Sequence, residues 1–336
     1  MAKKLNITIV GDGGWGTAIG MNLLNSGHSV TIWGPFKDYL IEVKSNGENS
    51  RYLPGVKIPE KMKWEDDPEV AVKHAEIVVL AVPSHFYETV CRKFSGLIPP
   101  AADVISISKG FCQSTRKRLT ETAKDILGIE NVAALSGPSH AEEVSRNMPT
   151  AVVIASSDQE QAYRLQSVFS GPAFRVYVSS DPVGVELGGA IKNVIALAAG
   201  ISDGLGYGDN SRAALITRGL AEMARLGSVC GGSPDTFAGL SGIGDLVVTC
   251  TSRHSRNRGV GERLGRGEKL DDIVDSMKQV AEGVWNCGIV LELARANNIE
   301  MPICETVQAV LEGTLDPRGA FVMLMSRDSK PEKYGV

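Results

Sequence analysis

Short apolar runs alternate with amphipathic stretches over the first half of the chain. Apolar, β-branched runs predict strands at residues 7–10, 30–33, 77–82, 104–107, 132–135, 151–154 and 174–178. Helical spacing predicts helices at residues 15–24 and 116–126. The run 77–82 is apolar throughout, which is typical of a strand covered on both faces. Strands that alternate with helices predict a mostly parallel sheet with right-handed crossovers.

The pattern changes after Asp181, where helical spacing continues and no strand is predicted. Helices are expected at residues 183–201, 212–226, 272–277, 288–296 and 306–311. The change predicts an α/β domain at residues 1–180 and a second, all-helical C-terminal domain at residues 181–336. A chain of 336 residues has the length of two ordinary domains.

Composition narrows the classes of partner. The chain has a net charge of −4, whereas a nucleic-acid-binding protein usually carries a basic surface. No nucleic-acid partner is therefore predicted. One stretch is nevertheless rich in arginine, with Arg253, Arg256, Arg258, Arg263 and Arg266. This cluster is either a solvated basic face or an anion site.

The cysteines and the apolar runs indicate in which cellular compartment the protein is expected. Six cysteines are scattered without a CxxC pair or a Cys/His cluster, which argues against a disulfide framework or a metal site. The N-terminus lacks the pattern of a signal peptide. The most apolar stretch, 183–201, contains Glu186, Lys192 and Asn193, so no membrane span is predicted. A cytoplasmic protein is expected.

A glycine motif follows the first predicted strand. Gly11-Asp12-Gly13-Gly14-Trp15-Gly16 fits the pattern GxGxxG between a strand and a helix. Gly11 allows a tight turn, Gly13 lets the backbone approach a pyrophosphate, and Gly16 lets helix and strand pack closely. The helix N-terminus offers N–H groups to the phosphates. The motif predicts a Rossmann-type dinucleotide-binding domain at residues 1–180, against the alternative of a glycine-rich turn without a ligand.

The choice of dinucleotide stays open. The second predicted strand ends in Gly34-Pro35-Phe36-Lys37, without the acid that usually binds the adenine ribose of NAD. Lys37 is one candidate for a 2′-phosphate, so both NAD and NADP are retained as cofactors. Phe36 and Phe86 are candidate cofactor contacts, and Phe86 is alternatively a core aromatic. His85 beside it is either an acid or base or a solvated loop residue.

Lys192 lies in the middle of a helix that is apolar or small on nearly every side. Such a helix is buried, and an isolated buried ammonium is costly. Burial disfavours the charged form of an amine, which suits proton transfer. Lys192 is therefore either a general acid–base or a structural lysine paired with a buried carboxylate.

Three further positions carry candidate chemistry. Lys109 follows a predicted strand at the sheet edge where ligands bind, or is an exposed loop lysine. Asp245 begins a helix and either caps it or pairs with Lys192. Arg256-Asn257 begins another helix, and a guanidinium beside helix N–H groups forms a phosphate receptor.

These segments together resemble the NAD(P)-dependent glycerol-3-phosphate dehydrogenase family over nearly the whole chain. The matching segments are Gly11–Ala18, Ser108–Gly110, Ser136–Glu143, Glu186–Asn193, Gly242–Cys250, Ser255–Asn257 and Val280–Gly283. One departure is Gly14, where the family often has serine. There a hydroxyl contact to the cofactor is lost and a backbone N–H remains.

The resemblance implies hydride transfer between NAD(P) and C2 of sn-glycerol 3-phosphate or dihydroxyacetone phosphate, without a metal. Lys192 resembles the general base, Asp245 would tune it, and Lys109 would hold the substrate and orient the reacting oxygen. The implied substrate-binding residues are Lys109, Gly137, Ser139, Lys192, Asn193, Asp245, Ser255, Arg256 and Asn257, with the phosphate at Arg256 and Asn257. The implied cofactor-binding residues are Gly11, Gly13, Gly14, Trp15, Gly16, Lys109, Ala141, Arg256, Val280 and Glu282.

The resemblance also implies a role in supplying glycerol 3-phosphate for phospholipids, and it leaves a homodimer open. Two alternatives stand beside it. The first is another two-domain dehydrogenase, acting on a 3-hydroxyacid or on 6-phosphogluconate, which also uses a helix lysine. The second is a cofactor-sensing regulator without catalysis. The phosphate site at Arg256-Asn257 and the segment Ser136–Ser139 favour glycerol phosphate over the first alternative, and the set of reactive residues argues against the second.

Overall fold

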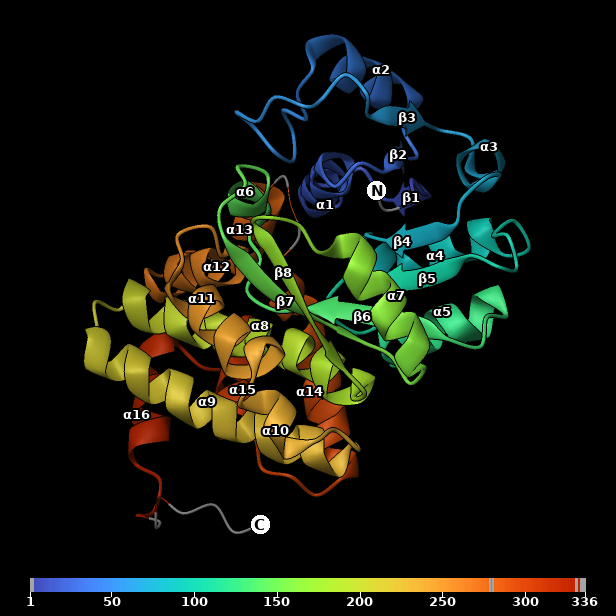
Figure 1. Cartoon of the computed structure of the whole chain (residues 1–336). Helices are drawn as coiled ribbons and strands as arrows, with labels where there is room; N and C mark the ends of the chain where they lie inside the picture. Colours follow the sequence, from blue (N-terminus) through green and yellow to red (C-terminus); the bar gives the residue numbers. More distant parts are fainter. Residues whose placement is uncertain (1–2, 278, 280, 330–331, 333–336) are drawn as a thin grey trace. The chain divides into compact units, whose positions relative to one another are not determined.

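The computed structural model describes residues 3–277, 279, 281–329 and 332. The chain divides into two compact units, residues 1–186 and 187–336, coloured from blue to light green and from light green to red in Figure 1. The division falls inside one helix, α8 (Pro182–Gly204). Each unit is described by itself below.

An eight-stranded sheet forms the first unit, in the order β3-β2-β1-β4-β5-β6-β7-β8. Its strands are β1 (Asn6–Val10), β2 (Ser29–Trp33), β3 (Lys63–Glu65), β4 (Ile77–Leu80), β5 (Asp103–Ser106), β6 (Val132–Ser136), β7 (Thr150–Ala155) and β8 (Phe174–Ser179). All neighbours are parallel except β6 and β7. Val10 is in register with both Trp33 and Leu80, so β1, β2 and β4 end at one level.

Helices cover both faces of this sheet because its strands alternate their apolar side chains. Ile7, Ile9 and Val79 face one core together with α1 (Gly14–Asn25) and α7 (Gln159–Phe169). Val78 and Leu80 face a second core together with α4 (Ser84–Phe94) and α5 (Leu119–Leu127). The remaining helices of this unit are α2 (Lys37–Asn46), α3 (Pro68–Val72) and α6 (Ala141–Val144).

The second unit is helical, and after β8 the described residues form no further strand. Beyond α8 its elements are α9 (Asp209–Val229), α10 (Pro234–Phe237), the π-helix η1 (Leu240–Gly244), α11 (Asp245–Thr251), α12 (Arg256–Gly265), α13 (Leu270–Asp275), α14 (Glu282–Ala296), α15 (Pro302–Leu311) and α16 (Pro317–Met325). Helix α8 has the length and hydropathy of a membrane span, but its apolar window is entirely buried within the protein. Its hydropathy is therefore that of a core helix.

Backbone contact without intervening side chains joins α8 to α12. A methyl group added to Gly200 or Gly204 of α8 would overlap the carbonyl oxygens of Arg258 and Glu262 on α12. A methyl group added to Gly261 of α12 would overlap the carbonyl oxygen of Leu197 on α8. Small residues thus set the spacing of the two helices that carry Lys192 and Arg256.

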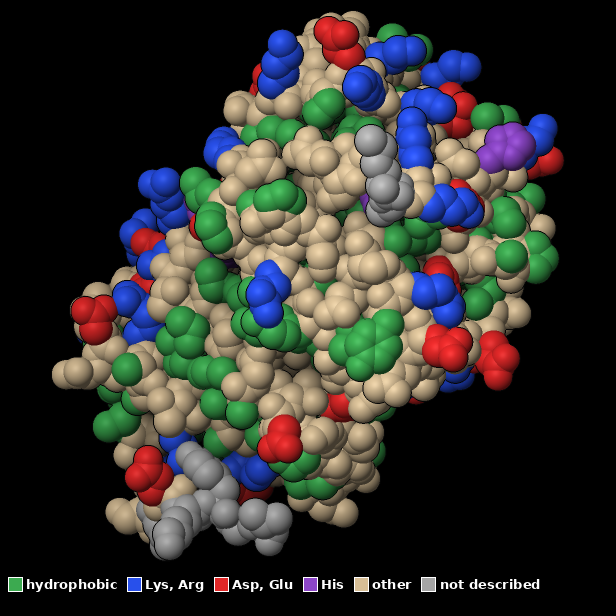
Figure 2. Space-filling model, viewed as in Figure 1, with side chains coloured by type: hydrophobic (Ala, Val, Ile, Leu, Met, Phe, Trp, Pro, Cys, Tyr) green, Lys and Arg blue, Asp and Glu red, His purple; other side chains and the backbone are tan. Residues whose placement is uncertain are grey.

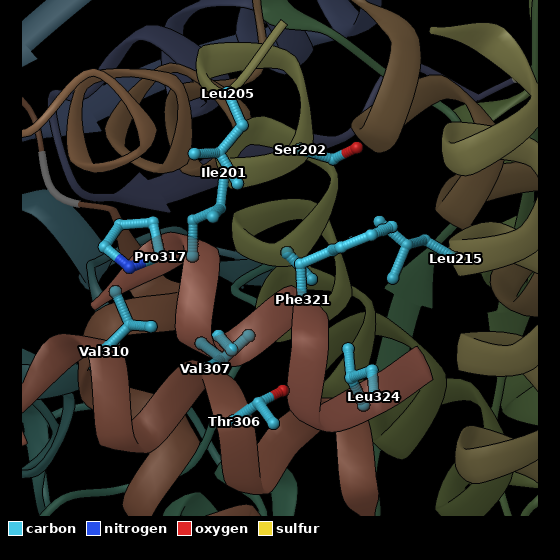
Figure 3. A pocket seen from close by; sticks show the side chains of 12 residues that line it. Ile201, Ser202, Leu205, Leu215, Thr306, Val307, Val310, Pro317, Phe321 and Leu324 are labelled. Atoms are coloured by element: carbon cyan, nitrogen blue, oxygen red, sulfur yellow. The ribbon is translucent and has the colours of Figure 1, made fainter. Parts of the chain in front are cut away.

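A small apolar cavity of about 40 Å³ lies between α8, α9, α15 and α16 (Figure 3). Ile201, Val307 and Phe321 contribute to its lining, and none of the predicted site residues does. The cavity is a packing feature of the helical unit and is separate from the predicted chemistry.

The sequence located most strands and helices, and the structure corrects several details. The three-residue strand β3 was not predicted, and the long apolar run ends as a strand at Leu80 rather than at residue 82. The helix predicted from Arg116 begins at Leu119 instead. Arg116 has a positive φ of 59°, which is incompatible with a right-handed helix.

Candidate functional site

The glycine loop between β1 and α1 has the local geometry that its sequence predicts. Gly11 has φ of 123°, and a Cβ there would lie 2.7 Å from the carbonyl oxygen of Ala81 at the end of β4. A Cβ on Gly16 would lie 2.6 Å from the carbonyl oxygen of Gly11. Only glycine allows this turn and this close approach of helix to strand.

The next two glycines differ in their surroundings. A Cβ on Gly13 would meet no atom within 4 Å, and no side chain caps α1 at this position. There is therefore open space beside the backbone of Gly13, directly before the start of α1, as a dinucleotide-binding loop requires. A Cβ on Gly14 would overlap the carbonyl oxygen of Tyr52. Serine is excluded at Gly14 unless the segment around Tyr52 moves.

Three aromatic residues predicted to contact the cofactor lie at the carboxyl ends of the first strands. The indole Nε1 of Trp15 donates a hydrogen bond to the carbonyl oxygen of Ile107, 3.1 Å away, beyond β5. Phe36 precedes α2 and Phe86 lies in the first turn of α4, and both are more than half exposed. Phe86 is thus not a core aromatic. Its ring lies 3.9 Å from that of His85, whose pKa is lowered by burial.

Three predicted substrate residues meet at one carbonyl group. Lys109 Nζ donates to the carbonyl oxygen of Gly137 at 3.0 Å, and Ser139 Oγ donates to the same oxygen at 2.8 Å. Lys109 follows β5 and Gly137 follows β6, so the ends of two adjacent parallel strands bring them together. Ala141, predicted to contact the cofactor, begins α6 and packs on the core beside α1.

In the helical unit, Lys192 is held by a carboxylate and a hydroxyl. Its Nζ donates to Asp245 Oδ1 at 2.6 Å and to Thr249 Oγ1 at 2.7 Å. All three residues are at least 95% buried. The hydroxyl of Thr249 donates to the backbone carbonyl oxygen of Asp245, so its oxygen is the acceptor for Lys192. Of the two roles foreseen for Asp245, pairing with Lys192 is the one observed.

The backbone around this pair explains how it forms. Asp245 follows the π-helical turn η1, and such turns often occur at functional sites. A Cβ on Gly188 would lie 2.5 Å from the carbonyl oxygen of Ser241 in η1, so α8 and η1 touch by backbone there. Lys192 is four residues after Gly188 and therefore faces the same side of α8, towards Asp245.

A second polar network ties three helices of this unit together. Asn257 Nδ2 donates to Asn193 Oδ1 at 2.9 Å, and the backbone N–H of Gly283 donates to Asn257 Oδ1 at 2.8 Å. Asn193 in turn donates to the carbonyl oxygen of Gly189. These contacts join α8, α12 and α14 one residue from Lys192 and one residue from Arg256.

Arg256 is the exposed first residue of α12. Ser255 caps this helix by accepting a hydrogen bond from the N–H of Arg258. Within the arginine cluster, Arg258 pairs with Asp203, Arg263 with Glu268 and Arg266 with Glu262. On the face shown in Figure 2, basic and acidic side chains are likewise interspersed. Much of the cluster is thus neutralised.

The predicted site residues fall into two groups by unit. Lys109, Gly137, Ser139, Ala141 and the glycine loop belong to the first unit, and Lys192, Asn193, Asp245, Ser255, Arg256, Asn257 and Glu282 to the second. Glu282 begins α14, and Val280 lies outside the described residues. Thr249 was not predicted as a site residue, although its spacing of four residues from Asp245 places both on one helix face.

Comparison with known proteins agrees with this geometry. The model of the N-terminus of NAD-dependent glycerol-3-phosphate dehydrogenase matches residues 6–162, and that of its C-terminus matches residues 181–322. Glycerol-3-phosphate dehydrogenase [NAD(P)+] of Clostridium acetobutylicum is 47% identical over 98% of this chain and 99% of its own length. The enzyme of the same name from Geobacillus kaustophilus is 47% identical over 97% and 96%.

A solved structure gives the same result. Glycerol-3-phosphate dehydrogenase from Coxiella burnetii superposes with a TM-score of 0.93 and 40% identity, covering 96% of this chain and 99% of that one. Both family models, the relatives and the fold converge, as the resemblance of the motifs predicted. The chain belongs to the NAD-dependent glycerol-3-phosphate dehydrogenase family.

Proposed function

We propose that this chain interconverts sn-glycerol 3-phosphate and dihydroxyacetone phosphate by hydride transfer with NAD or NADP. The observation that carries the proposal is the buried Lys192, held by Asp245 and Thr249 in a chain whose relatives are named for that activity. A cofactor-sensing regulator has no need of such a buried lysine. A dinucleotide held at the glycine loop would accept or supply the hydride at C2.

Lys192 performs the proton transfer. In oxidation its neutral amine takes the proton of the C2 hydroxyl as the hydride leaves C2, and the C2–O bond becomes a carbonyl. In reduction its ammonium returns that proton to the C2 oxygen. Asp245 and Thr249 fix the position of Nζ, and Asp245 stabilises the charged form that arises during oxidation.

The substrate carries a phosphate, and the chain has cationic and N–H groups that can bind it. Arg256 stands at the N-terminus of α12, where guanidinium and helix N–H groups both favour an anion. Asn193 and Asn257 support that position through their buried network, and Ser255 supports it as the helix cap. Lys109, aligned through Gly137 with Ser139, orients the reacting oxygen.

The deciding experiment is spectrophotometric oxidation of NADH and of NADPH with dihydroxyacetone phosphate. Turnover with this substrate, and none with the oxidation products of 3-hydroxyacids or of 6-phosphogluconate, is the expected result. Binding of cofactor without turnover of any of them would favour the sensor. The supply of glycerol 3-phosphate to phospholipids and a cytoplasmic location belong to the same proposal. Scattered cysteines without a CxxC pair support a reducing compartment.

A further inference from the structure

The tip of strand β2 is occupied by a side chain from a different strand. Gly34, the first residue after β2, has no side chain of its own. A Cβ built on Gly34 would lie 2.7 Å from Asp12 Oδ2 and 2.8 Å from Asp12 Cγ. The carboxylate of Asp12, which follows β1, therefore fills the place that a side chain at the tip of β2 would take.

Asp12 is fixed in this place by its neighbours. Its backbone carbonyl oxygen accepts a hydrogen bond from Asn49 Nδ2 at 2.8 Å, and Asn49 is fully buried. The same amide group bonds Thr17 and accepts from the hydroxyl of Tyr39. The loop that carries Asp12 is thus held before any ligand arrives.

The Asp12 carboxylate itself is poorly satisfied. The residue is 9% exposed, and Oδ2 has no hydrogen-bond partner among the residues that the structure describes. Burial raises the pKa of Asp12. A buried acceptor without a donor is costly unless a ligand supplies one.

In dinucleotide-binding folds, an acid at the tip of the second strand accepts hydrogen bonds from the adenine ribose and disfavours a 2′-phosphate. What matters for recognition is the position of the carboxylate, and not the strand that delivers it. We propose that Asp12 replaces the missing acid at the tip of β2, binds the adenine-ribose hydroxyls and gives this enzyme a preference for NAD(H) over NADP(H). This inference rests on the dinucleotide-binding part of the proposed function.

Two nearby basic residues would favour a 2′-phosphate and so oppose this preference, but their electrostatic effect is weaker than that of Asp12. Arg51 lies over the ring of Tyr39, 4.5 Å from its centroid, and acts electrostatically on Asp12. Both Arg51 and Lys37 are exposed, whereas Asp12 is buried. Exposed charges are screened by salt and water far more than buried ones, so the carboxylate dominates the field at a 2′-phosphate.

The test is fluorescence titration of NADH and NADPH with the full chain, which needs no turnover. We expect the unmodified protein to bind NADH at least tenfold more tightly than NADPH. Asp12→Asn keeps the shape and removes the charge, so its NADPH binding should tighten and the ratio should fall at least tenfold. A native preference for NADPH, or a ratio that changes less than twofold in both Asp12→Asn and Asp12→Ala, would overturn the proposal.

Moving the carboxylate from residue 12 to residue 34 tests whether its position, and not the residue that carries it, determines the preference. In Asp12→Gly/Gly34→Asp the three atoms nearest the new Cβ are removed, and an acid returns to the strand tip itself. We expect this double variant to regain the NADH preference that Asp12→Gly loses. A double variant that binds NADPH as well as Asp12→Gly does would contradict the positional argument. Melting temperatures confirm that each variant is folded.

Two comparisons separate this inference from its rivals. Lys37→Ala should change the NADH/NADPH ratio less than twofold, and a large loss of NADPH binding there would assign the discrimination to Lys37 instead. Absence of turnover with dihydroxyacetone phosphate, together with an Asp12-dependent preference for NADH, would overturn the proposed substrate and leave this inference standing.

Discussion

The Nζ atom of Lys192 lies 2.6 Å from Oδ1 of Asp245, and both residues are at least 95% buried. A buried ion pair is expensive to form, and removing one partner typically costs about 3–5 kcal/mol because the other charge stays buried. The pair therefore links stability and proton transfer, and variants at these positions need separate measurements of folding and of kcat.

Lys192→Ala should lower kcat by about 10²–10⁴-fold, because it removes the proposed acid–base group. Binding of NADH, followed by fluorescence, should persist. Lys117→Ala is a suitable control, since that lysine forms an exposed pair with Asp125. A Lys192→Ala protein that is folded and retains native kcat would exclude Lys192 as the base.

Thr249→Val should slow turnover and cost about 1–3 kcal/mol of unfolding free energy, because the hydroxyl that accepts from Lys192 is lost inside the core. Thr249→Ser keeps the hydroxyl and should restore most of kcat. The pair of variants is compared by urea unfolding and by the pH dependence of kcat. Equal kcat values for the Val and Ser variants would show that the hydroxyl does not position Lys192.

Arg256→Ala should raise KM for dihydroxyacetone phosphate by about 10–100-fold, which corresponds to the loss of one charged hydrogen-bonding partner. Arg253→Ala removes an exposed arginine three residues earlier and leaves the start of α12 intact. Its KM should stay within about twofold of native. Similar KM values for the two variants would move the phosphate site away from Arg256.

Glu222 predicts a dependence of stability on pH. This carboxyl of α9 accepts hydrogen bonds from the N–H groups of Ile303 and Cys304 at the start of α15, and burial raises its pKa to about 7. Between the unfolded pKa of 4.5 and about 7 the folded state binds more protons, so stability falls as pH rises through this window.

Glu222→Gln resembles the protonated form and should remove that slope, which amounts to about 3 kcal/mol over the window. Urea unfolding of both proteins at pH 5, 6, 7 and 8 measures it. Relative to Glu222→Gln, the native protein should lose stability towards pH 8. Parallel stability curves would show that the folded pKa of Glu222 is not raised.

The contact of α8 with α12 predicts opposite effects for two glycines of one helix. Gly261→Ala places a methyl group on the carbonyl oxygen of Leu197 and should cost about 1–3 kcal/mol or more. A Cβ on Gly259 meets nothing within 4 Å, so Gly259→Ala should stabilise α12 by up to about 1 kcal/mol. Thermal unfolding compares them, and two similar shifts in Tm would argue against the close backbone contact.

Local features of the chain could be predicted from sequence, and long-range ones could not. The glycine loop and most strands follow from residue types within a few positions of each other. The antiparallel pairing of β7 with β6 cannot be predicted from the alternation of apolar and polar residues. The residues around Arg116 likewise do not indicate its positive φ. In the site, a lysine in the middle of an apolar helix needs a buried carboxylate, which made Asp245 a candidate partner as well as a candidate helix cap.

The networks of the site depend on folding. The contact between Asn193 and Asn257 joins residues 64 positions apart. The residues next to either asparagine do not predict this contact. The filling of the tip of β2 by Asp12 joins two loops in the same way. The sequence shows only that the usual acid is missing after Trp33, and the fold supplies the substitute.

The level ends of β1, β2 and β4, set by the register of Val10 with Trp33 and Leu80, have a consequence for how such enzymes diversify. Loops that leave the sheet at one height border the same small volume, so a functional group can pass from one loop to its neighbour while the ligand stays where it is. A sequence motif that assigns cofactor preference from one fixed position will misassign proteins in which the functional group has moved to a neighbouring loop. A pattern that asks which residues share the volume will classify them correctly.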